Sequence, residues 1–400
     1  MASGSGAKRR VQKCIEINLA RRGVASSSLG TAACAKLESR RVIRVAGGDS
    51  LKFLQGLVTN DVNTLSPQQP LLYTHLLNHK GRSLFDMFVY LDHRSATGEE
   101  EEGNIYLLDC REDVADTLLR LLQMYKLRSN TNIADVSGQC EVWGLFPKEV
   151  SEGYPTDEFI ENASKLDFLP DPRSTFLGFR RIFPGSSTFN VDEDEFQKVD
   201  ESYLDINRRY LGVLEGLELS NQIPLECNLD LLNGVSFTKG CYVGQELTAR
   251  THFQGLVRKR NVPVFLKVMD GDDDVEPTAV ETTETVYRNG GEKLADTLRS
   301  VVDSQNPAFA SSEAEDSKTT IPVFRSDKKG RKAGKLIVSS LLTSEGAGGE
   351  NPSTIGLAMA LLKTDTLGGQ DGGATAQLFS TDSAGRRVQI VPFIPPWFRP

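Results

Sequence analysis

The chain has 400 residues, of which 39% are hydrophobic and 25% charged, a composition typical of a globular protein with more than one core. No apolar run reaches the roughly 20 residues that a membrane-spanning helix needs, so no membrane span is expected. The formal net charge of −8 argues against direct nucleic-acid binding, which requires a basic face.

The start of the chain is basic. Residues 1–44 contain ten lysines and arginines and two acidic residues. A basic, acid-poor segment with serine and alanine is typical of an organellar transit peptide, so residues 1–36 are predicted to be such a leader. The alternative is a disordered basic terminus without a targeting role.

Residues 37–150 are predicted to form a first α+β domain. The segment RRVIRVAGGDS has a strand-like run, a Gly-Gly turn and Asp49 in position to cap a helix. Two apolar runs at 71–77 and 82–91 flank Asn78-His79-Lys80-Gly81 and predict a β-hairpin. A strand at 104–109, a helix at 113–127 and two strands within 131–146 follow.

Residues 151–260 are predicted to form a second α+β domain, with a strand at 176–183 and a helix at 201–214. Short alternating runs after residue 260 predict a C-terminal β-barrel over 261–400. Within it, residues 270–318 carry thirteen acids against four bases and are predicted to be a disordered insertion.

Standard catalytic and metal-binding patterns are absent from the sequence. It has no phosphate-binding GxxxxGK[ST] loop, no GxGxxG after a strand, no HExxH and no GxSxG. No two of the six cysteines have CxxC spacing, so no self-contained zinc or iron-sulfur site is expected. The four histidines, which lack metal-ligand spacing, are interpreted as structural or surface residues: His75, His79, His93 and His252.

The segment FTKGCYVGQELTAR, residues 237–250, is the strongest functional signal. Cys241 is expected just ahead of a helix, where the helix N-terminus and Lys239 would favour the thiolate. The competing interpretation is a tight glycine-rich turn around a small buried thiol. Glu246 and Arg250, four positions apart, fit a helix-surface ion pair.

KGCYVGQE resembles the K-G-C-[FY]-x-G-Q-E signature of the YgfZ/GcvT-like proteins. The similarity extends through FLQGLVTNDV, NHKGRSLFDMFVY, YKLR and LEGLELSNQIPLECNLDLLNGVSFTKGC, and the branch it most resembles is the mitochondrial iron-sulfur cluster assembly factors. The resemblance implies an aminomethyltransferase-like α+β fold, with ferredoxin-like domains and a C-terminal β-barrel. The signature positions are Lys239, Gly240, Cys241, Tyr242, Gly244, Gln245 and Glu246.

The resemblance implies a non-enzymatic assembly factor of the mitochondrial matrix that promotes [4Fe-4S] cluster formation on client enzymes. Its partner would be an A-type scaffold protein. Because a [2Fe-2S] cluster takes about four ligands and the motif has one cysteine, a cluster bound by Cys241 would be shared with that partner. Lys239 would stabilise the charge of the thiolate or cluster, and Gln245 and Glu246 would orient the loop.

The alternative function is a folate-dependent one-carbon transferase, which would bind tetrahydrofolate and need a placed carboxylate for proton transfer. Asp61 lies in a segment that the resemblance shares with such enzymes. The folate-pocket candidates are Arg208, Glu226 and Asn228. A third hypothesis is an interaction module in which the thiol is incidental.

Overall fold

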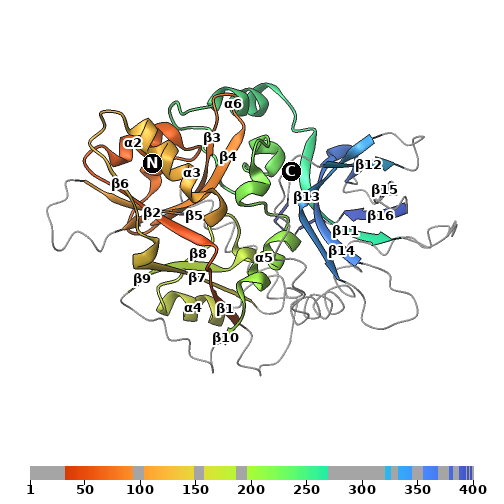
Figure 1. The fold of residues 1–400 in the computed structure, drawn as a ribbon, viewed down its shortest axis with the longest axis horizontal. Coiled ribbons are helices and arrows are strands. Elements are labelled where there is room, and N and C mark those ends of the chain that lie inside the picture. Colours follow the sequence, from red (N-terminus) through yellow and green to blue (C-terminus); the bar gives the residue numbers. More distant parts are fainter. Residues whose placement is uncertain are drawn as a thin grey trace.

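The structure, a computed structural model, describes residues 32–92, 103–147, 157–185, 196–268, 320–325, 332–344, 355–367, 378–381, 387–392, 394–395 and 397–398. Two five-stranded sheets with their helices form one body, and a closed six-stranded barrel stands beside it (Figure 1). Most of the predicted leader, His93 and the predicted insertion at 270–318 lie outside the described residues. Among the helices described, none is long and apolar enough to cross a membrane.

The first sheet has the strand order β3-β4-β5-β2-β6, and every neighbouring pair is antiparallel. Its strands are β2 (Arg40–Ala46), β3 (Leu71–Leu77), β4 (Ser83–Asp92), β5 (Ile105–Arg111) and β6 (Asn132–Asp135). The predicted hairpin is confirmed as β3 and β4, with Leu71 opposite Tyr90 and Leu77 opposite Ser83.

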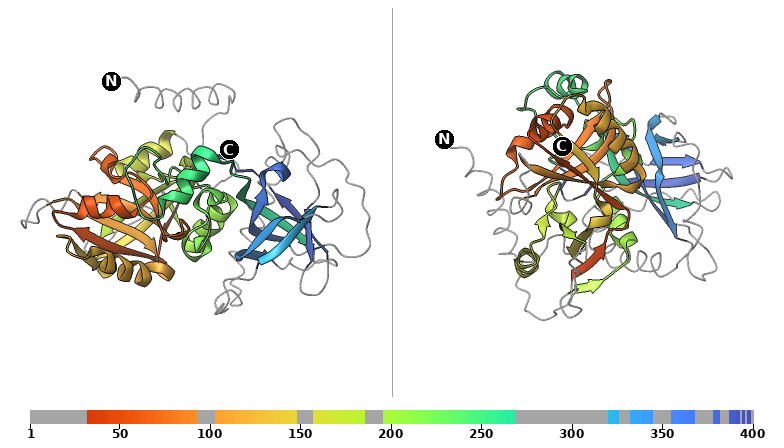
Figure 2. Two further views of the ribbon diagram at one scale, coloured as in Figure 1. Left: turned by 90° about the horizontal axis from the view of Figure 1, so that it is seen from above. Right: turned by 60° about the vertical axis from the view of Figure 1, so that its left-hand side comes forward.

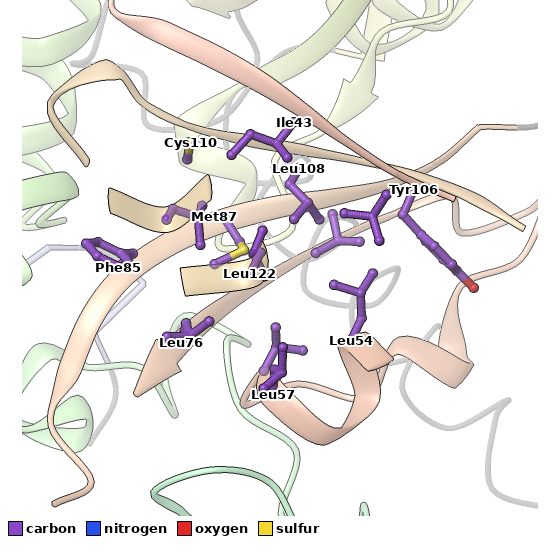
Figure 3. Close-up of a cluster of buried hydrophobic side chains, with 14 of the residues drawn as sticks. Ile43, Leu54, Leu57, Leu76, Phe85, Met87, Tyr106, Leu108, Cys110 and Leu122 are labelled. Carbon is purple, nitrogen blue, oxygen red and sulfur yellow. The ribbon is translucent and has the colours of Figure 1, made fainter. Parts of the chain in front are cut away.

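Two helices, α2 (Ser50–Leu57) and α3 (Glu112–Lys126), cover one face of this sheet. Their apolar faces pack on Met87, Leu108 and other strand residues, and Figure 3 shows this core. Asp49 stands at the N-cap position of α2 as predicted, but its side chain makes no capping bond. Its Oδ2 instead accepts a hydrogen bond from the Asn130 backbone N–H at 2.8 Å.

The second sheet has the order β10-β1-β7-β9-β8. Its strands are β1 (Ala32–Lys36), β7 (Cys140–Pro147), β8 (Leu169–Pro170), β9 (Phe179–Pro184) and β10 (Phe196–Lys198). One face packs on the first sheet through Ala35, Val42 and Val142, and the other packs on α4 (Asp157–Lys165). The body therefore has four layers, with helices outside the two sheets.

Two predicted boundaries differ from this arrangement. The predicted leader ended at Lys36, yet Ala32–Lys36 form β1, in which Ala33 and Cys34 are fully buried. β7 lies before the predicted domain boundary at residue 150 but pairs with β9 in the second sheet. At residues 32–36 the end of the basic N-terminal segment overlaps a strand, and amino-acid composition alone does not separate the two.

The barrel closes in the order β11-β14-β13-β12-β15-β16. Its strands are β11 (Lys259–Val268), β12 (Thr320–Arg325), β13 (Lys332–Ser344), β14 (Ile355–Lys363), β15 (Leu378–Thr381) and β16 (Arg387–Pro392). Two views in Figure 2 show it set beside the two-sheet body. The predicted α+β class and C-terminal barrel are confirmed.

Helix α5 (Glu201–Tyr210) and two short 3-10 helices, η6 (Gly216–Leu219) and η7 (Pro224–Cys227), lie between body and barrel (Figure 1). The helix predicted over 201–214 stops at Tyr210, since Gly212 adopts the left-handed conformation that ends many helices, with φ +72°. The Arg208 guanidinium donates to the Val213 carbonyl at 2.5 Å just beyond this end. The helix α6 (Gln245–Gln254) then follows the signature motif.

Candidate functional site

The signature motif forms a loop that leads into α6, beside the end of α2 and the turn of the β3–β4 hairpin. Backbone bonds tie the approach to this loop onto residues 56–59: Ser236 N donates to Thr59 O at 3.1 Å, and Val243 N donates to Gly56 O at 3.2 Å. The Thr59 hydroxyl also donates to Gly234 O at 2.7 Å. The motif is therefore fixed to a segment far earlier in the chain.

Lys239 points inward and is only 8% exposed. Its Nζ donates to three backbone carbonyls, those of Gln55 at 2.7 Å, Val58 at 2.7 Å and Asn60 at 3.0 Å. Burial lowers the pKa of Lys239 to about 8, against the opposing attraction of Asp61. Since three carbonyls occupy its ammonium group, Lys239 anchors the loop, whereas the sequence had suggested charge stabilisation at the thiol.

Tyr242 and Val243 form the inner side of the loop. Tyr242 is 8% exposed, and the Lys239 ammonium lies 4.9 Å from its ring centroid. Burial raises the pKa of Tyr242 to about 12, so the phenol stays neutral. Val243 packs against the core of the first sheet. Lys239, Tyr242 and Val243 thus face the interior, whereas Cys241 faces outward.

Gly244 and Gly81 hold the loop against the hairpin turn. Gly244 has φ +77° and forms the N-cap of α6, and a Cβ there would lie 2.4 Å from the Asn78 carbonyl oxygen. Gly81 has φ +75°, and a Cβ there would lie 2.6 Å from Leu247 Cβ. Both positions combine a left-handed backbone with a contact that excludes any side chain, which explains the glycine at each.

Cys241 is a free, exposed cysteine. Of the other described cysteines, Cys34, Cys110 and Cys227 are buried and Cys140 is half-buried. Burial raises the pKa of each of the three buried thiols, which keeps them protonated and inert. Among the described cysteines, Cys241 is therefore the one placed for a reaction or for metal binding.

An open pocket of about 630 Å³ surrounds Cys241. Its wall comes from the hairpin turn, the motif loop and the outer face of α6. The lining residues are His79, Cys241, Tyr242, Gly244, Gln245, Glu246, Ala249, Arg250, Phe253 and Gln254.

Most of the predicted motif positions meet at this pocket. Besides Cys241, its lining includes Tyr242, Gly244, Gln245 and Glu246. Lys239 supports the pocket from within, through its bonds to the α2 end. Gly240 is exposed, and a Cβ added there would have no atom within 4 Å. The structure therefore brings the signature together around the thiol, with Gly240 as a surface position.

Glu246 is paired with Arg250 on the surface of α6. The Arg250 guanidinium donates to Glu246 Oε1 at 2.7 Å, and the side chains of Arg250 and Glu246 are 63% and 86% exposed. An exposed pair at this spacing contributes about 0.3–0.5 kcal/mol. The helix-surface interpretation of these two residues is confirmed.

Apolar and aromatic side chains border the same region. The rings of Phe237 and His252 stack with centroids 3.5 Å apart, and Phe253 meets both edge-on. Phe253 is 69% exposed, and Leu256 just beyond α6 is 80% exposed. Phe253, which also lines the pocket, therefore adds exposed apolar surface beside the thiol.

The folate-pocket candidates do not come together. Arg208 is buried near a cavity of about 50 Å³ between the sheets, where it binds Glu218 at 2.8 Å. Asn228 is fully buried on the barrel side, where its Nδ2 donates to the Asn261 carbonyl at 2.7 Å. Glu226 is half-buried on η7, and burial raises its pKa. Arg208 and Asn228 are both engaged in bonds that support the fold.

The cavity beside Arg208 is enclosed by buried ion pairs. Arg40 binds Asp109 at 2.6 Å and Glu215 at 3.0 Å, and Arg173 also binds Glu215. Burial would raise the pKa of Glu215, but the surrounding arginines, Arg173 foremost, hold it well below its usual range. Arg180 of β9 also binds Asp109 of β5 at 2.6 Å, so this cluster cross-links the two sheets.

Asp61 caps the short 3-10 helix Val62–Thr64, next to Asn60, whose carbonyl binds Lys239. Its carboxylate accepts bonds from Gln55 Nε2 at 2.9 Å and Asn63 N at 3.1 Å. Burial raises the pKa of Asp61, but these hydrogen bonds outweigh it and the pKa is lowered overall. Asp61 is thus an ionised turn residue.

His79 and Phe253 were not singled out as site residues from the sequence. His79 occupies the second position of the hairpin turn, from which it lines the pocket. Phe253 continues the helical face of Glu246 and Ala249. No signal in the sequence linked either residue to Cys241.

The chain resembles curated iron-sulfur cluster assembly factors. It is 34% identical over 271 residues to the mitochondrial factor IBA57 of Mus musculus, covering 64% of this chain and 73% of that protein. It is 36% identical over 244 residues to the Homo sapiens protein, with 58% and 66% covered. For the Dictyostelium discoideum homologue the identity is 35% over 255 residues, and the chain spans 62% of that relative's length.

The fold has a counterpart among solved structures. Aminomethyltransferase T of the glycine cleavage system from Bartonella henselae superposes with a TM-score of 0.56, covering 92% of this chain and 87% of that one. At 14% sequence identity the two share the fold, which confirms the predicted aminomethyltransferase-like architecture. No family model matches the chain. With 34% identity across 73% of the mouse protein, the chain belongs to the IBA57 family of mitochondrial iron-sulfur cluster assembly factors.

Proposed function

We propose that the protein promotes [4Fe-4S] cluster formation on mitochondrial client enzymes, acting in the matrix with an A-type scaffold protein. In this proposal Cys241 binds a [2Fe-2S] cluster that the two proteins share. The observation that carries it is the position of Cys241, an exposed thiol in an open pocket of about 630 Å³. The protein acts as an assembly factor, with the cluster as its cargo.

Ligand number supports sharing. An iron-sulfur cluster takes about four protein ligands, as a rule cysteines. Among the described residues, no group of three or more His, Cys, Asp and Glu side chains is placed to hold a metal ion. The described part of the chain therefore lacks a complete ligand set, and in this proposal the scaffold protein supplies the remainder.

The shape of the site also supports sharing. The inner residues of the loop are held by Lys239 and by the contact between Gly244 and the hairpin turn. The backbone of the loop that carries the Cys241 thiol is therefore already fixed, so binding a partner costs little conformational entropy there. The exposed Phe253 and Leu256 provide apolar surface that a docked partner would cover, which would shield the cluster from water.

The alternative, folate-dependent one-carbon transfer, has weaker support. The fold of a glycine-cleavage aminomethyltransferase favours it. The cavity between the sheets, however, measures about 50 Å³, and small-molecule sites occupy roughly 300–1,000 Å³. Asp61 is tied into its turn as an ionised hydrogen-bond acceptor, so it is poorly placed as a proton donor. These observations favour the assembly role.

The test is an anaerobic mixing experiment with an A-type scaffold that carries a [2Fe-2S] cluster. Wild-type protein and Cys140→Ser, which alters a half-buried cysteine away from the pocket, are expected to co-elute with the scaffold as a coloured complex. Cys241→Ser is expected to yield no coloured complex. A Cys241→Ser complex with unchanged absorption would show that Cys241 is not a ligand and would leave its thiol incidental.

A further inference from the structure

The end of helix α3 exposes two large apolar side chains. Met124, in the last turn of the helix, is 61% exposed, and Leu127, directly after the helix, is 86% exposed. Among the described residues, neither is packed into one of the buried apolar clusters. Neither lines the pocket around Cys241. This surface is therefore separate from the site described above.

Leu127 has a backbone conformation that leucine rarely adopts. Its φ of 47° and ψ of −111° lie close to those of the first central residue of a type II′ turn, a position usually taken by glycine. A hydrogen bond from Ser129 N to Lys126 O at 2.8 Å closes this turn. The other described non-glycine residues with positive φ are polar, namely Asp167, Asn221, Asn228 and Asn233. Leu127 therefore bears backbone strain while most of its side chain stays in solvent.

The turn after α3 is fixed to the start of α2. Asn130 N donates to Asp49 Oδ2 at 2.8 Å, and Asp49 N donates to Asn130 O at 3.1 Å. Thr131, which is 3% exposed, donates its backbone N–H to Ser129 O at 2.9 Å. A Cβ at Gly47 would lie 2.4 Å from Asn130 O, so the two segments are in close contact. These contacts fix the backbone of the turn and also engage the Asp49 carboxylate.

Basic residues accompany the two apolar side chains. Arg120 lies one helical turn before Met124 on the same face of α3, and Lys126 and Arg128 flank Leu127 in the chain. Within the described part of the chain, neither Lys126 nor Arg128 forms an ion pair or a side-chain hydrogen bond. The chain as a whole has a formal net charge of −8, so this end of α3 differs in sign from the average. Its charge is complementary to that of an anionic partner.

We propose that this end of α3 binds the surface of an anionic lipid membrane. The side chains of Met124 and Leu127 insert among the lipids, and the three basic side chains bind headgroup phosphates. A stable protein partner would need to cover roughly 800 Å² on this chain, far more than a turn with two apolar side chains offers. A membrane needs less, because a few apolar side chains together with several bases suffice for reversible binding at the interface. The proposal goes beyond the proposed function and does not depend on it.

The test measures by sedimentation how the full chain binds vesicles made of equal parts of phosphatidylcholine and phosphatidylglycerol. Leu127→Gly removes the inserted side chain and suits the turn, so it should be at least as stable as wild type in urea yet bind on the order of tenfold more weakly. Met124→Gln, on the helix surface, should also bind severalfold more weakly. Arg128→Gln should weaken binding about fivefold. Leu256→Gly, which removes a leucine that is 80% exposed elsewhere, is the matched control and should bind like wild type.

A second measurement locates the inserted residues. Tryptophan introduced by Met124→Trp should be quenched by vesicles whose lipids carry bromine on their acyl chains, because its indole then lies among those chains. Tryptophan introduced by Leu256→Trp should show no such quenching. Equal quenching of the two variants would contradict insertion at the end of α3.

The basic start of the full chain is also expected to attract anionic vesicles, so the comparison is made between variants of the same chain. If wild type and Leu127→Gly bind equally well, the leader carries the binding and the proposal is overturned. Equally strong binding of wild type to phosphatidylcholine alone, or no binding to either kind of vesicle, overturns it as well. Binding of soluble poly-glutamate without binding of vesicles would indicate an acidic protein partner instead.

Discussion

The two glycines of the motif provide a sharp test of how the loop is held. Gly244→Ala is expected to destabilise the protein, whereas Gly240→Ala, in the same motif, is expected to be nearly neutral. A Cβ at Gly244 would meet Asn78 O at 2.4 Å and Leu77 Cβ at 2.9 Å, while a Cβ at Gly240 would have no atom within 4 Å.

The magnitude follows from two terms. An alanine held at φ +77° costs about 1–2 kcal/mol relative to a right-handed conformation. Forcing a methyl group into a filled contact costs about 1–3 kcal/mol more. Gly244→Ala should therefore lower the free energy of unfolding by about 2–5 kcal/mol, and Gly240→Ala should stay within about 0.5 kcal/mol of wild type, as surface substitutions usually do.

Urea unfolding followed by circular dichroism measures both variants. Co-elution with the cluster-loaded scaffold should also weaken for Gly244→Ala, because displacing the loop moves Cys241 away from the hairpin turn. Equal unfolding free energies for the two variants would refute the idea that the Gly244 contact holds the motif. A Gly240→Ala variant less stable than Gly244→Ala would refute it equally.

Three further predictions concern neighbouring side chains. Lys239→Met removes a donor shared by three backbone carbonyls and should lower the free energy of unfolding in urea by about 1–3 kcal/mol, whereas Lys80→Met on the exposed turn should change it very little. Burial lowers the pKa of His75 to about 3 in the folded protein, whereas in the unfolded chain it is near 6.5. The neutral, buried His75 therefore makes its full contribution to the free energy of unfolding above about pH 6.5, and that contribution falls by about 2 kcal/mol between pH 7 and pH 5. His75→Gln should remove this part of the pH dependence of stability, and an unchanged pH dependence in the variant would contradict the prediction. Arg250→Ala should change stability by no more than about 0.5 kcal/mol, and a larger loss would mean that the exposed pair with Glu246 supports α6.

Local patterns predicted most of the first sheet. The hairpin followed from two apolar runs around a turn with Gly81, and α2 and α3 followed from helical apolar spacing, because these signals involve residues near one another in the chain. β1 was not predicted as a strand, because Ala32–Lys36 is mostly alanine and ends the basic segment that was predicted to be a leader. Its pairing with β7 depends on residues more than a hundred positions later.

The site could be predicted only in part for the same reason. Cys241 stood out through its motif, and its exposure follows from the inward direction of Lys239 and Tyr242. The partners of Lys239 are backbone carbonyls, which carry no residue signature, so its anchoring role could not be derived from sequence. Arg208 was predicted to line a ligand pocket, but it forms a buried ion pair with Glu218. The sequence does not distinguish an arginine that pairs with a buried carboxylate from one that binds a ligand.

The parallel pairing of β1 with β10 has a consequence for the order in which the chain folds. The first sheet uses residues 40–135, so a chain that emerges from a ribosome or a membrane channel N-terminus first can complete it early. β1 precedes all of these residues but has to wait for β7, and then for Phe196–Lys198, before both of its edges are paired. During that interval an apolar strand remains unpaired next to a finished domain, which makes it a natural place for a chaperone to bind.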